Sequence, residues 1–181
     1  IGVDFSPASA DAARWTAQHF GNGAELILAH AIPLPEPPIS SGRHGKHELV
    51  VATLVEGARK RLQDLRDTIQ AQSVSVEVRE GEPAATLADI ANESKADLLI
   101  VGLRGEHTGA GQSAGTTAQR AVRELSIPVL VVARPSDRPL SLIVVAVEEE
   151  TTARESLRWA AMLSNRFNAR VTALHVGGEV I

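Results

Sequence analysis

Hydrophobic positions along this chain follow two alternating patterns. Short continuous apolar runs are typical of strands buried on both faces of a parallel sheet, and they occupy 26–29 (within a strand predicted at 24–32), 98–101, 129–132 and 143–147. Between these runs, apolar residues recur every three or four positions, which is the spacing of a helix that covers a sheet. The helices predicted in this way are 8–20, 47–72, 84–94 and one that begins near 115. The alternation predicts an α/β fold with a doubly wound parallel sheet.

Two further segments complete the predicted sheet. Ile1–Val3 has the character of the end of a first strand that closes on Asp4, and Ser6 with Pro7 is a good N-cap and first-turn pair for the next helix. Because this strand is too short to begin a core, we expect that residues are missing upstream. Val74–Glu80 alternates apolar and polar residues, which predicts a strand at the edge of the sheet.

Length and charge narrow the classes of function. The chain has 181 residues, a formal net charge of -4 and a sequence pI near 5.9, and this balance argues against nucleic acid or an anionic membrane as the main partner. The absence of cysteine removes disulfides, zinc–thiolate sites and thiol nucleophiles. No apolar run approaches the roughly 20 residues of a membrane span, and no signal peptide is visible. We therefore expect a cytoplasmic protein without membrane insertion.

A proline-rich segment at 33–45 separates the second predicted strand from the second helix. It is longer than an ordinary strand-to-helix connection, so one interpretation is a lid or a partner-binding segment. Its composition favours the other interpretation, which is disorder. His44 and His47 form a pair with no nearby carboxylate cluster, and such a pair is better explained as solvated surface than as a metal site.

The segment that carries chemistry is the loop between the strand 98–101 and the helix near 115. Gly102 and Gly105 are separated by two residues, Gly105 and Gly115 by nine, and Thr116 and Thr117 follow directly. A glycine at the end of a strand lets a ligand approach the backbone closely, and Thr116 is suited to cap the helix. The N-terminus of that helix then favours an anion such as phosphate. The alternative is a flexible glycine loop without a ligand.

This spacing resembles the G-2x-G-9x-G-(S/T) signature of the nucleotide-binding branch of the universal stress protein family. The similarity extends over residues 1–134, and besides the glycine loop it is carried by Val3-Asp4, Leu28-Ala29-His30, Gly81-Glu82-Pro83, Ala96-Asp97-Leu98 and Ile127 to Val132. It implies a Rossmann-like, five-stranded parallel sheet of order 3-2-1-4-5, with nucleotide bound where strands 1 and 4 diverge. The general rule for open parallel sheets places a ligand at the same carboxyl edge.

The resemblance also implies roles for individual residues on the base and ribose side. Asp4 would meet the adenine–ribose side or a metal-bound water, with Mg²⁺ accompanying the nucleotide. Ala31 and Ile32 would line the base, while Gly102 and Gly105 would admit the ribose and phosphates. An alternative role for Asp4, from the residues alone, is to cap the first helix.

On the phosphate side, the resemblance implies that Gly115, Thr116 and Thr117 bind oxygens through N–H and hydroxyl groups. Arg104, between two of the glycines, has the chemistry to pair with a phosphate, or else to form a surface salt bridge. The sequence departs from the family pattern at 109–114, where the residues before the last glycine are small. We therefore expect a more mobile loop and weaker or reshaped nucleotide binding.

The pattern of the first strands and helix begins again after a linker at 135–141. The predicted domains are thus 1–134 and an incomplete second copy at 142–181, which ends after a strand, a helix and a strand. Trp15 and Trp159 correspond at an offset of 144 residues, and both are expected to pack in the core. His30 and His175 correspond at an offset of 145 and are expected to be hydrogen-bonded core or turn residues. The second copy has Glu148 in place of the aspartate and no glycine loop.

Together these features predict an ATP-binding stress-response protein, with AMP or cyclic AMP as alternative ligands. A homodimer or a tandem pseudo-dimer is the expected assembly. No nucleophile–base arrangement, HExxH pattern or Walker lysine is present, so we expect no enzyme, and at most slow ATP hydrolysis or autophosphorylation. Two other functions stay open. One is a nucleotide-free interaction or dimerisation module, including a cytosolic regulatory part of a larger protein, and the other is an adenylylating enzyme of the broader related fold.

Overall fold

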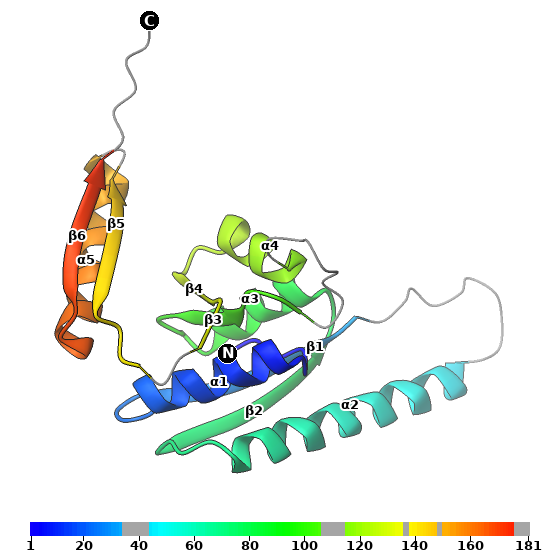
Figure 1. The fold of residues 1–181 in the computed structure, drawn as a ribbon. Helices are drawn as coiled ribbons and strands as arrows, with labels where there is room; N and C mark the ends of the chain where they lie inside the picture. Colours follow the sequence, from blue (N-terminus) through cyan, green and yellow to red (C-terminus); the bar gives the residue numbers. More distant parts are fainter. Residues whose placement is uncertain (34–43, 106–114, 136–137, 148–149, 176–181) are drawn as a thin grey trace, which may run out of the picture. The chain divides into compact units, whose positions relative to one another are not determined.

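The computed structural model describes residues 1–33, 44–105, 115–135, 138–147 and 150–175 (Figure 1). The chain divides into two compact units, Ile1–Pro135 (unit 1) and Ser136–Ile181 (unit 2). In the part of the chain that the structure describes, no helix is long and apolar enough to cross a membrane.

Unit 1 alternates helices and strands as the hydrophobic pattern predicts. Its elements are α1 (Pro7–Phe20), β1 (Glu25–Ile32), α2 (His44–Asp67), β2 (Ser73–Glu80), α3 (Pro83–Glu93), β3 (Leu99–Gly102), α4 (Thr116–Glu124) and β4 (Val129–Val132). The largest difference from the prediction is α2, which ends at Asp67 instead of near Gln72. The next two amides, of Thr68 and Ile69, bond three residues back instead of four, and this tightening closes the helix.

The strands of unit 1 form two parallel pairs, β1 with β2 and β3 with β4. The predicted first strand, Ile1–Val3, lies between the pairs but is too short to count as a strand here. It is represented by Gly2, which makes parallel bridges to Ala29 of β1 and to Val101 of β3. The carboxyl ends of the segment Ile1–Val3, of β1 and of β3 therefore lie at the same edge of the sheet, directly after residues 3, 32 and 102.

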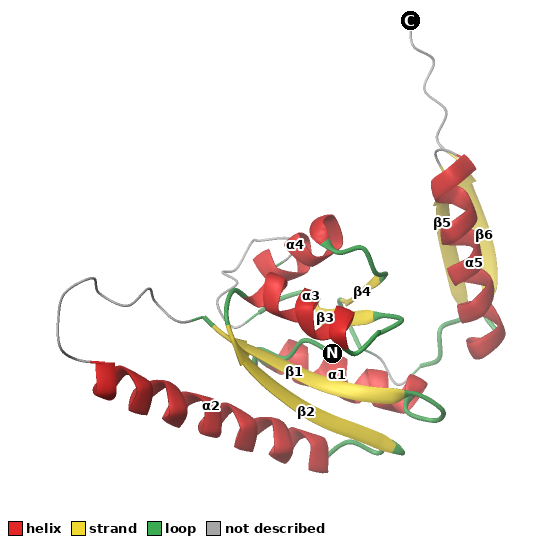
Figure 2. Ribbon diagram, turned by 180° about the vertical axis from the view of Figure 1, so that it is seen from behind, coloured by secondary structure: helices red, strands yellow, loops and turns green. Residues whose placement is uncertain are grey.

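Helices cover both faces of this sheet, and the period-2 alternation of the strands explains which residue faces which helix. Ala29 and Val101 pack with α3 and α4, around Leu87 and Ala121. The neighbouring residue Leu28 points to the other face, where it packs with buried residues of α1 and α2. Figure 2 shows α1 and α2 on one side of the strands and α3 and α4 on the other. The doubly wound arrangement of helices over parallel strands is confirmed in this unit.

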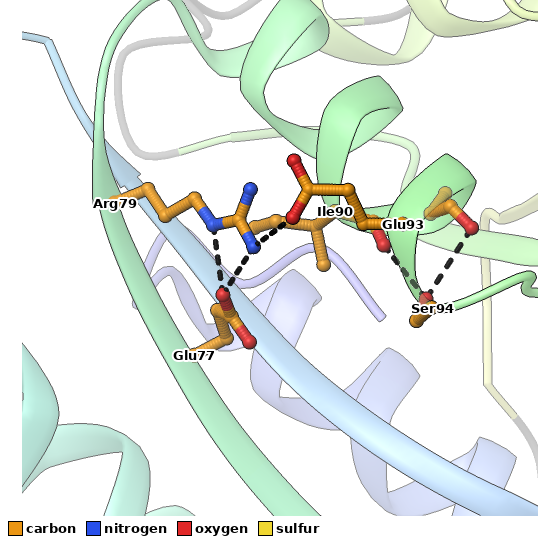
Figure 3. A network of polar contacts seen from close by, with 6 residues as sticks. Glu77, Arg79, Ile90, Glu93 and Ser94 are labelled. Atoms are coloured by element: carbon orange, nitrogen blue, oxygen red, sulfur yellow. Dashed lines mark hydrogen bonds and ion pairs between the residues drawn. The ribbon is translucent and has the colours of Figure 1, made fainter.

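A polar network ties β2 to α3 across one face (Figure 3). Arg79 donates from Nε to Glu77 Oε1 at 2.7 Å and from Nη2 to Glu93 Oε2 at 2.7 Å. The hydrogen bond from Arg79 lowers the pKa of Glu93, and the hydrogen bonds to Glu93 and Glu77 raise the pKa of Arg79. At the end of α3, Ser94 Oγ donates to the carbonyl of Ile90 at 2.7 Å. The ion pair with Glu93 thus ties β2 to the C-terminal end of α3.

Unit 2 consists of β5 (Leu142–Val147), α5 (Glu150–Phe167) and β6 (Arg170–His175), with the two strands parallel. This is the predicted strand, helix and strand. His175 Nδ1 donates to the carbonyl of Val147 at 2.8 Å, so the prediction that this histidine is hydrogen-bonded is confirmed. Glu148 lies outside the described residues, as do 34–43 of the proline-rich segment and 106–114 of the glycine loop, and the side chains of His44 and His47 are likewise not described.

Candidate functional site

A cavity of about 770 Å³ (the central cavity) lies in unit 1 at the carboxyl edge of β1 and β3, a volume typical of small-molecule sites. The structure brings together at this cavity all nine residues that the resemblance implies. They are Asp4, Ala31, Ile32, Gly102, Arg104, Gly105, Gly115, Thr116 and Thr117. Their placement follows from the parallel sheet, because a parallel sheet gathers all its strand ends at one edge. Nucleotide binding by these residues stays a prediction.

Asp4 follows the first strand segment and holds the start of α1. Its Oδ1 accepts from the amide of Ser6 at 3.0 Å and from Ser6 Oγ at 2.6 Å. Ser6 is the N-cap of α1, as predicted, and its Oγ accepts from the amide of Ser9 at 3.2 Å. The alternative in which Asp4 itself caps α1 is therefore wrong. Asp4 instead orients the capping hydroxyl, and it lines the central cavity.

Phe5 and His30 form an aromatic corner of the cavity. His30 Nδ1 donates to the carbonyl of Val3 at 2.7 Å, which confirms the prediction of a hydrogen-bonded histidine. The rings of Phe5 and His30 are 4.4 Å apart between centroids. Phe5 has a φ of 66°, a value that a bulky residue adopts only where its surroundings enforce it. The turn after Asp4 thus directs the Phe5 ring to the cavity.

Gly102 ends β3 where α1 passes closely over it. A Cβ built on Gly102 would lie 3.2 Å from three backbone atoms of Ala8 and Ser9. Beyond it, the carbonyl of Leu103 accepts from the amide of Gly115 at 2.7 Å. This bond joins the two ends of the glycine loop, so the start of α4 is fixed next to the end of β3.

The N-terminus of α4 opens on the central cavity. Gly115 is the N-cap residue and makes no side-chain capping bond, so the prediction that Thr116 caps the helix is wrong by one position. The Gly115 amide, to which the resemblance gives a role in phosphate binding, donates to the carbonyl of Leu103 in this structure. The next three amides, of Thr116, Thr117 and Ala118, have no hydrogen-bond partner among the residues the structure describes.

The opposite wall of the cavity is apolar. Ala31 and Ile32 end β1 and are each 7% exposed. Leu54 and Ala58 of α2 line the same region, as does Pro83 at the start of α3. This wall is suited to the flat apolar face of a base or another ring.

The charged residues that line the cavity are Asp4, Arg61 and Arg104. The alternative of a surface salt bridge for Arg104 is not found, because its side chain pairs with none of the described residues. Mg²⁺ in nucleotide sites is held through one or two carboxylates and the phosphates, so Asp4 fits that role. In the described part of the chain, no three His, Asp or Glu side chains gather as a metal site.

Sequence reasoning missed Phe5 and Arg61 as cavity residues. Arg61 is exposed on α2, as a charged helix residue is expected to be, and its Cζ also lies 3.9 Å from the centroid of the Phe5 ring. The only feature of the sequence that could have indicated Arg61 as a cavity residue is its position next to the buried helix positions Ala58 and Leu62. The cation–π contact joins residues 56 positions apart, and a local pattern does not report it.

Comparison with known proteins connects this fold and cavity with a family. Residues 1–133 match the model of the Universal stress protein family. The chain is 32% identical over 135 residues to the universal stress protein Rv1636 of Mycobacterium tuberculosis, an alignment that covers 73% of this chain and 92% of the relative. Over 99% of this chain, it is 25% identical to a longer universal stress protein of Mycobacterium bovis, and it spans 62% of that relative's length.

Solved structures show the same fold. The protein MJ0577 superimposes with a TM-score of 0.62 at 25% identity, over 75% of this chain and 94% of that chain. A universal stress protein solved in complex with cAMP superimposes with a TM-score of 0.50 at 28% identity, over the same shares of the two chains.

Proposed function

This chain belongs to the universal stress protein family, and on that premise we propose that unit 1 binds an adenine nucleotide in the central cavity, with ATP and Mg²⁺ as the expected ligands. The observation that carries the proposal is the start of α4. Thr116, Thr117 and Ala118 line the cavity, and none of their amides has a partner among the described residues. Uncapped amides at the positive end of a helix dipole are suited to phosphate oxygens.

Further residues complete this placement of the nucleotide. Arg104, whose side chain has no partner among the described residues, adds a cation to the phosphate side, where charge-assisted hydrogen bonds are short and strong. Ala31 and Ile32 offer the base an apolar surface. Asp4 takes the position of the Mg²⁺ or ribose ligand. A relative of this fold has been solved with cAMP, and this supports an adenine nucleotide as the ligand class.

The finer points of the family resemblance remain proposals. We propose a regulatory or protective role in the stress response, in which the bound nucleotide orders the cavity and biases assembly as a homodimer or a tandem pseudo-dimer. A cytoplasmic location, the absence of catalysis beyond slow ATP hydrolysis, and the five-stranded order 3-2-1-4-5 belong to the same proposal. Unit 2 supports the tandem interpretation because it repeats the strand–helix–strand of unit 1, including the histidine-to-carbonyl bond.

The test begins with what the purified protein carries. Mass spectrometry of small molecules released from gently purified protein is expected to detect an adenine nucleotide. With ATP and Mg²⁺ at about 100 times Kd, the free energy of unfolding should rise by about 2.7 kcal/mol and the melting temperature should rise with it.

A pair of charge variants of α4 makes this test specific. Thr116→Glu places a carboxylate at an exposed first-turn position, where it favours the helix but repels phosphate. Gln119→Glu adds the same charge to the same helix at an exposed position that does not line the cavity. We expect ATP to stabilise the Gln119→Glu variant as it does wild type, and to leave the Thr116→Glu variant unshifted. Equal stabilisation of both variants, or none in wild type, would refute nucleotide binding at α4.

A further inference from the structure

One face of α2 forms a wall of the central cavity. Leu54, Gly57, Ala58 and Arg61 all line it, and their spacing of three, four and seven positions places them on one side of the helix. α2 packs against β1 and β2, whereas α4 packs against β4 and α3. Because the two strand pairs lie on opposite sides of Gly2, the α2 wall belongs to the side of the cavity away from the α4 amides.

Arg61 presents an unpaired cation on this wall. Its guanidinium stacks on Phe5, and among the residues the structure describes it has no hydrogen bond or ion pair. The nearby carboxylate of Asp64 is paired with Lys60 at 3.8 Å. A guanidinium that stacks on an aromatic face keeps its in-plane N–H groups available to acceptors. Arg61 is therefore an exposed residue of the cavity wall that stacks on Phe5, and its N–H donors have no partner among the described residues.

The presence of a glycine at position 57 is a second observation about this wall, and it does not depend on the charge of Arg61. Glycine is unfavourable inside a helix relative to alanine, so its presence near the middle of α2 calls for a reason. Protein packing supplies none, because a Cβ built on Gly57 meets no atom within 4 Å. The missing side chain instead leaves room on the cavity side of the helix, where a ligand can approach the backbone.

We propose that Arg61 and Gly57 recognise the base of the bound nucleotide, an inference that rests on the proposed function and deepens it. The phosphates belong with α4 and Arg104, so the ring belongs at the end of β1, beside α2. There Gly57 lets the ring approach the helix, and Arg61 donates a hydrogen bond to an unprotonated ring nitrogen of the purine. Arg61 is thus a specificity residue for the base and not a phosphate ligand.

Calorimetric titration of the whole chain with AMP and with ATP, each with Mg²⁺, tests this assignment. Arg61→Gln is expected to raise Kd about tenfold, by the same factor for both nucleotides, because the base is common to them. Arg59→Gln is the matched control, since Arg59 is exposed on the same helix and does not line the cavity. Its two Kd values should equal those of wild type. Gly57→Leu should also raise both Kd values without lowering the melting temperature of the free protein.

The outcomes separate this inference from the function on which it rests. Wild type that binds neither nucleotide overturns both. Wild type that binds, with Kd values of Arg61→Gln within about twofold of its own, overturns only the base-recognition role. A loss that is several times larger for ATP than for AMP shows that Arg61 contacts phosphate, and this also overturns the assignment. Normal affinity in Gly57→Leu would exclude close approach of the ring to α2.

Discussion

Replacing Gly102 with alanine is expected to destabilise unit 1 whether or not a ligand is present. The sequence-based interpretation gave this glycine a role in admitting ribose and phosphates. In the structure, a Cβ at position 102 would lie 3.2 Å from the carbonyl carbon and oxygen of Ala8 and from the amide nitrogen of Ser9. These are backbone atoms in the first turn of α1 and cannot rotate aside, so α1 or the end of β3 has to move by a few tenths of an ångström.

The size of the effect follows from this overpacking. Forcing one extra methyl group into a packed interior typically costs about 1–3 kcal/mol. For a domain of this size, each kcal/mol lowers the melting temperature by roughly 3–5 °C. We therefore expect Gly102→Ala to melt about 3–15 °C below wild type in the absence of ligand. The same difference should persist with ATP if the variant still binds it.

Thermal and urea unfolding of the ligand-free protein, followed by circular dichroism, are suitable measurements. Gly57→Ala is the matched control, because a Cβ there meets nothing within 4 Å. Alanine is the better helix former, so this variant should be about 0.5–1 kcal/mol more stable than wild type. The two glycine-to-alanine changes are thus expected to shift stability in opposite directions.

One result would refute this reasoning. If ligand-free Gly102→Ala melts within about 1 °C of wild type, the approach of α1 does not require glycine at this position. A loss of nucleotide affinity without a loss of stability would then return Gly102 to its sequence-based role. If Gly57→Ala is destabilised as well, the packing around α2 differs from the structure.

Three further predictions concern the supports of the site. Ser6→Ala removes the buried N-cap of α1 and the hydroxyl bonded to Asp4, and urea titration should show a loss of about 1–2 kcal/mol. Asp4→Asn keeps an oxygen for Ser6 but removes the charge, so calorimetry with and without EDTA should show ATP affinity that no longer depends on Mg²⁺, while an unchanged dependence would exclude Asp4 as the metal ligand. Arg79 lowers the pKa of Glu93 from its ordinary value of 4.5, so the stability this contact adds is present above that pH and is lost as the pH falls below it. The melting temperatures of wild type and Glu93→Gln should therefore converge on acidification from pH 6, and a constant gap would contradict the pair.

The elements that could be predicted are those whose pattern is local. Continuous apolar runs located β1, β3 and β4, and the cap Ser6 located the start of α1, because burial on both faces and capping both act over a few residues. The gathering of the nine site residues at one edge follows from parallel strands as well. The prediction of the N-cap of α4 from the local sequence pattern was wrong by one residue. At the start of α4, Gly115 and Thr116 are both acceptable N-cap residues, and the sequence does not distinguish them.

Features that depend on distant contacts could not be predicted. The short segment Ile1–Val3 takes its place only through hydrogen bonds to β1 and β3, which lie far along the chain. A glycine such as Gly102 is equally compatible with a ligand and with a passing helix, and only the structure shows α1 above it. Likewise, Arg61 is exposed as a charged helix residue is expected to be, but its contact with the Phe5 ring appears only in the structure.

A hydrogen bond from a histidine to a strand-end carbonyl occurs in both units, and it distinguishes contacts that hold the strands together from contacts particular to the cavity. His30 and His175 each bond a strand-end carbonyl in the same way, 2.7 and 2.8 Å from Nδ1 to oxygen. At the offset of 144 residues, however, Phe5 corresponds to Glu149 in the sequence. Because the contact persists where this neighbour changes, it fastens parallel strands and does not depend on the requirements of a ligand. The chemistry particular to the cavity of unit 1 therefore includes the aromatic residue that supports Arg61, which position 149 does not repeat.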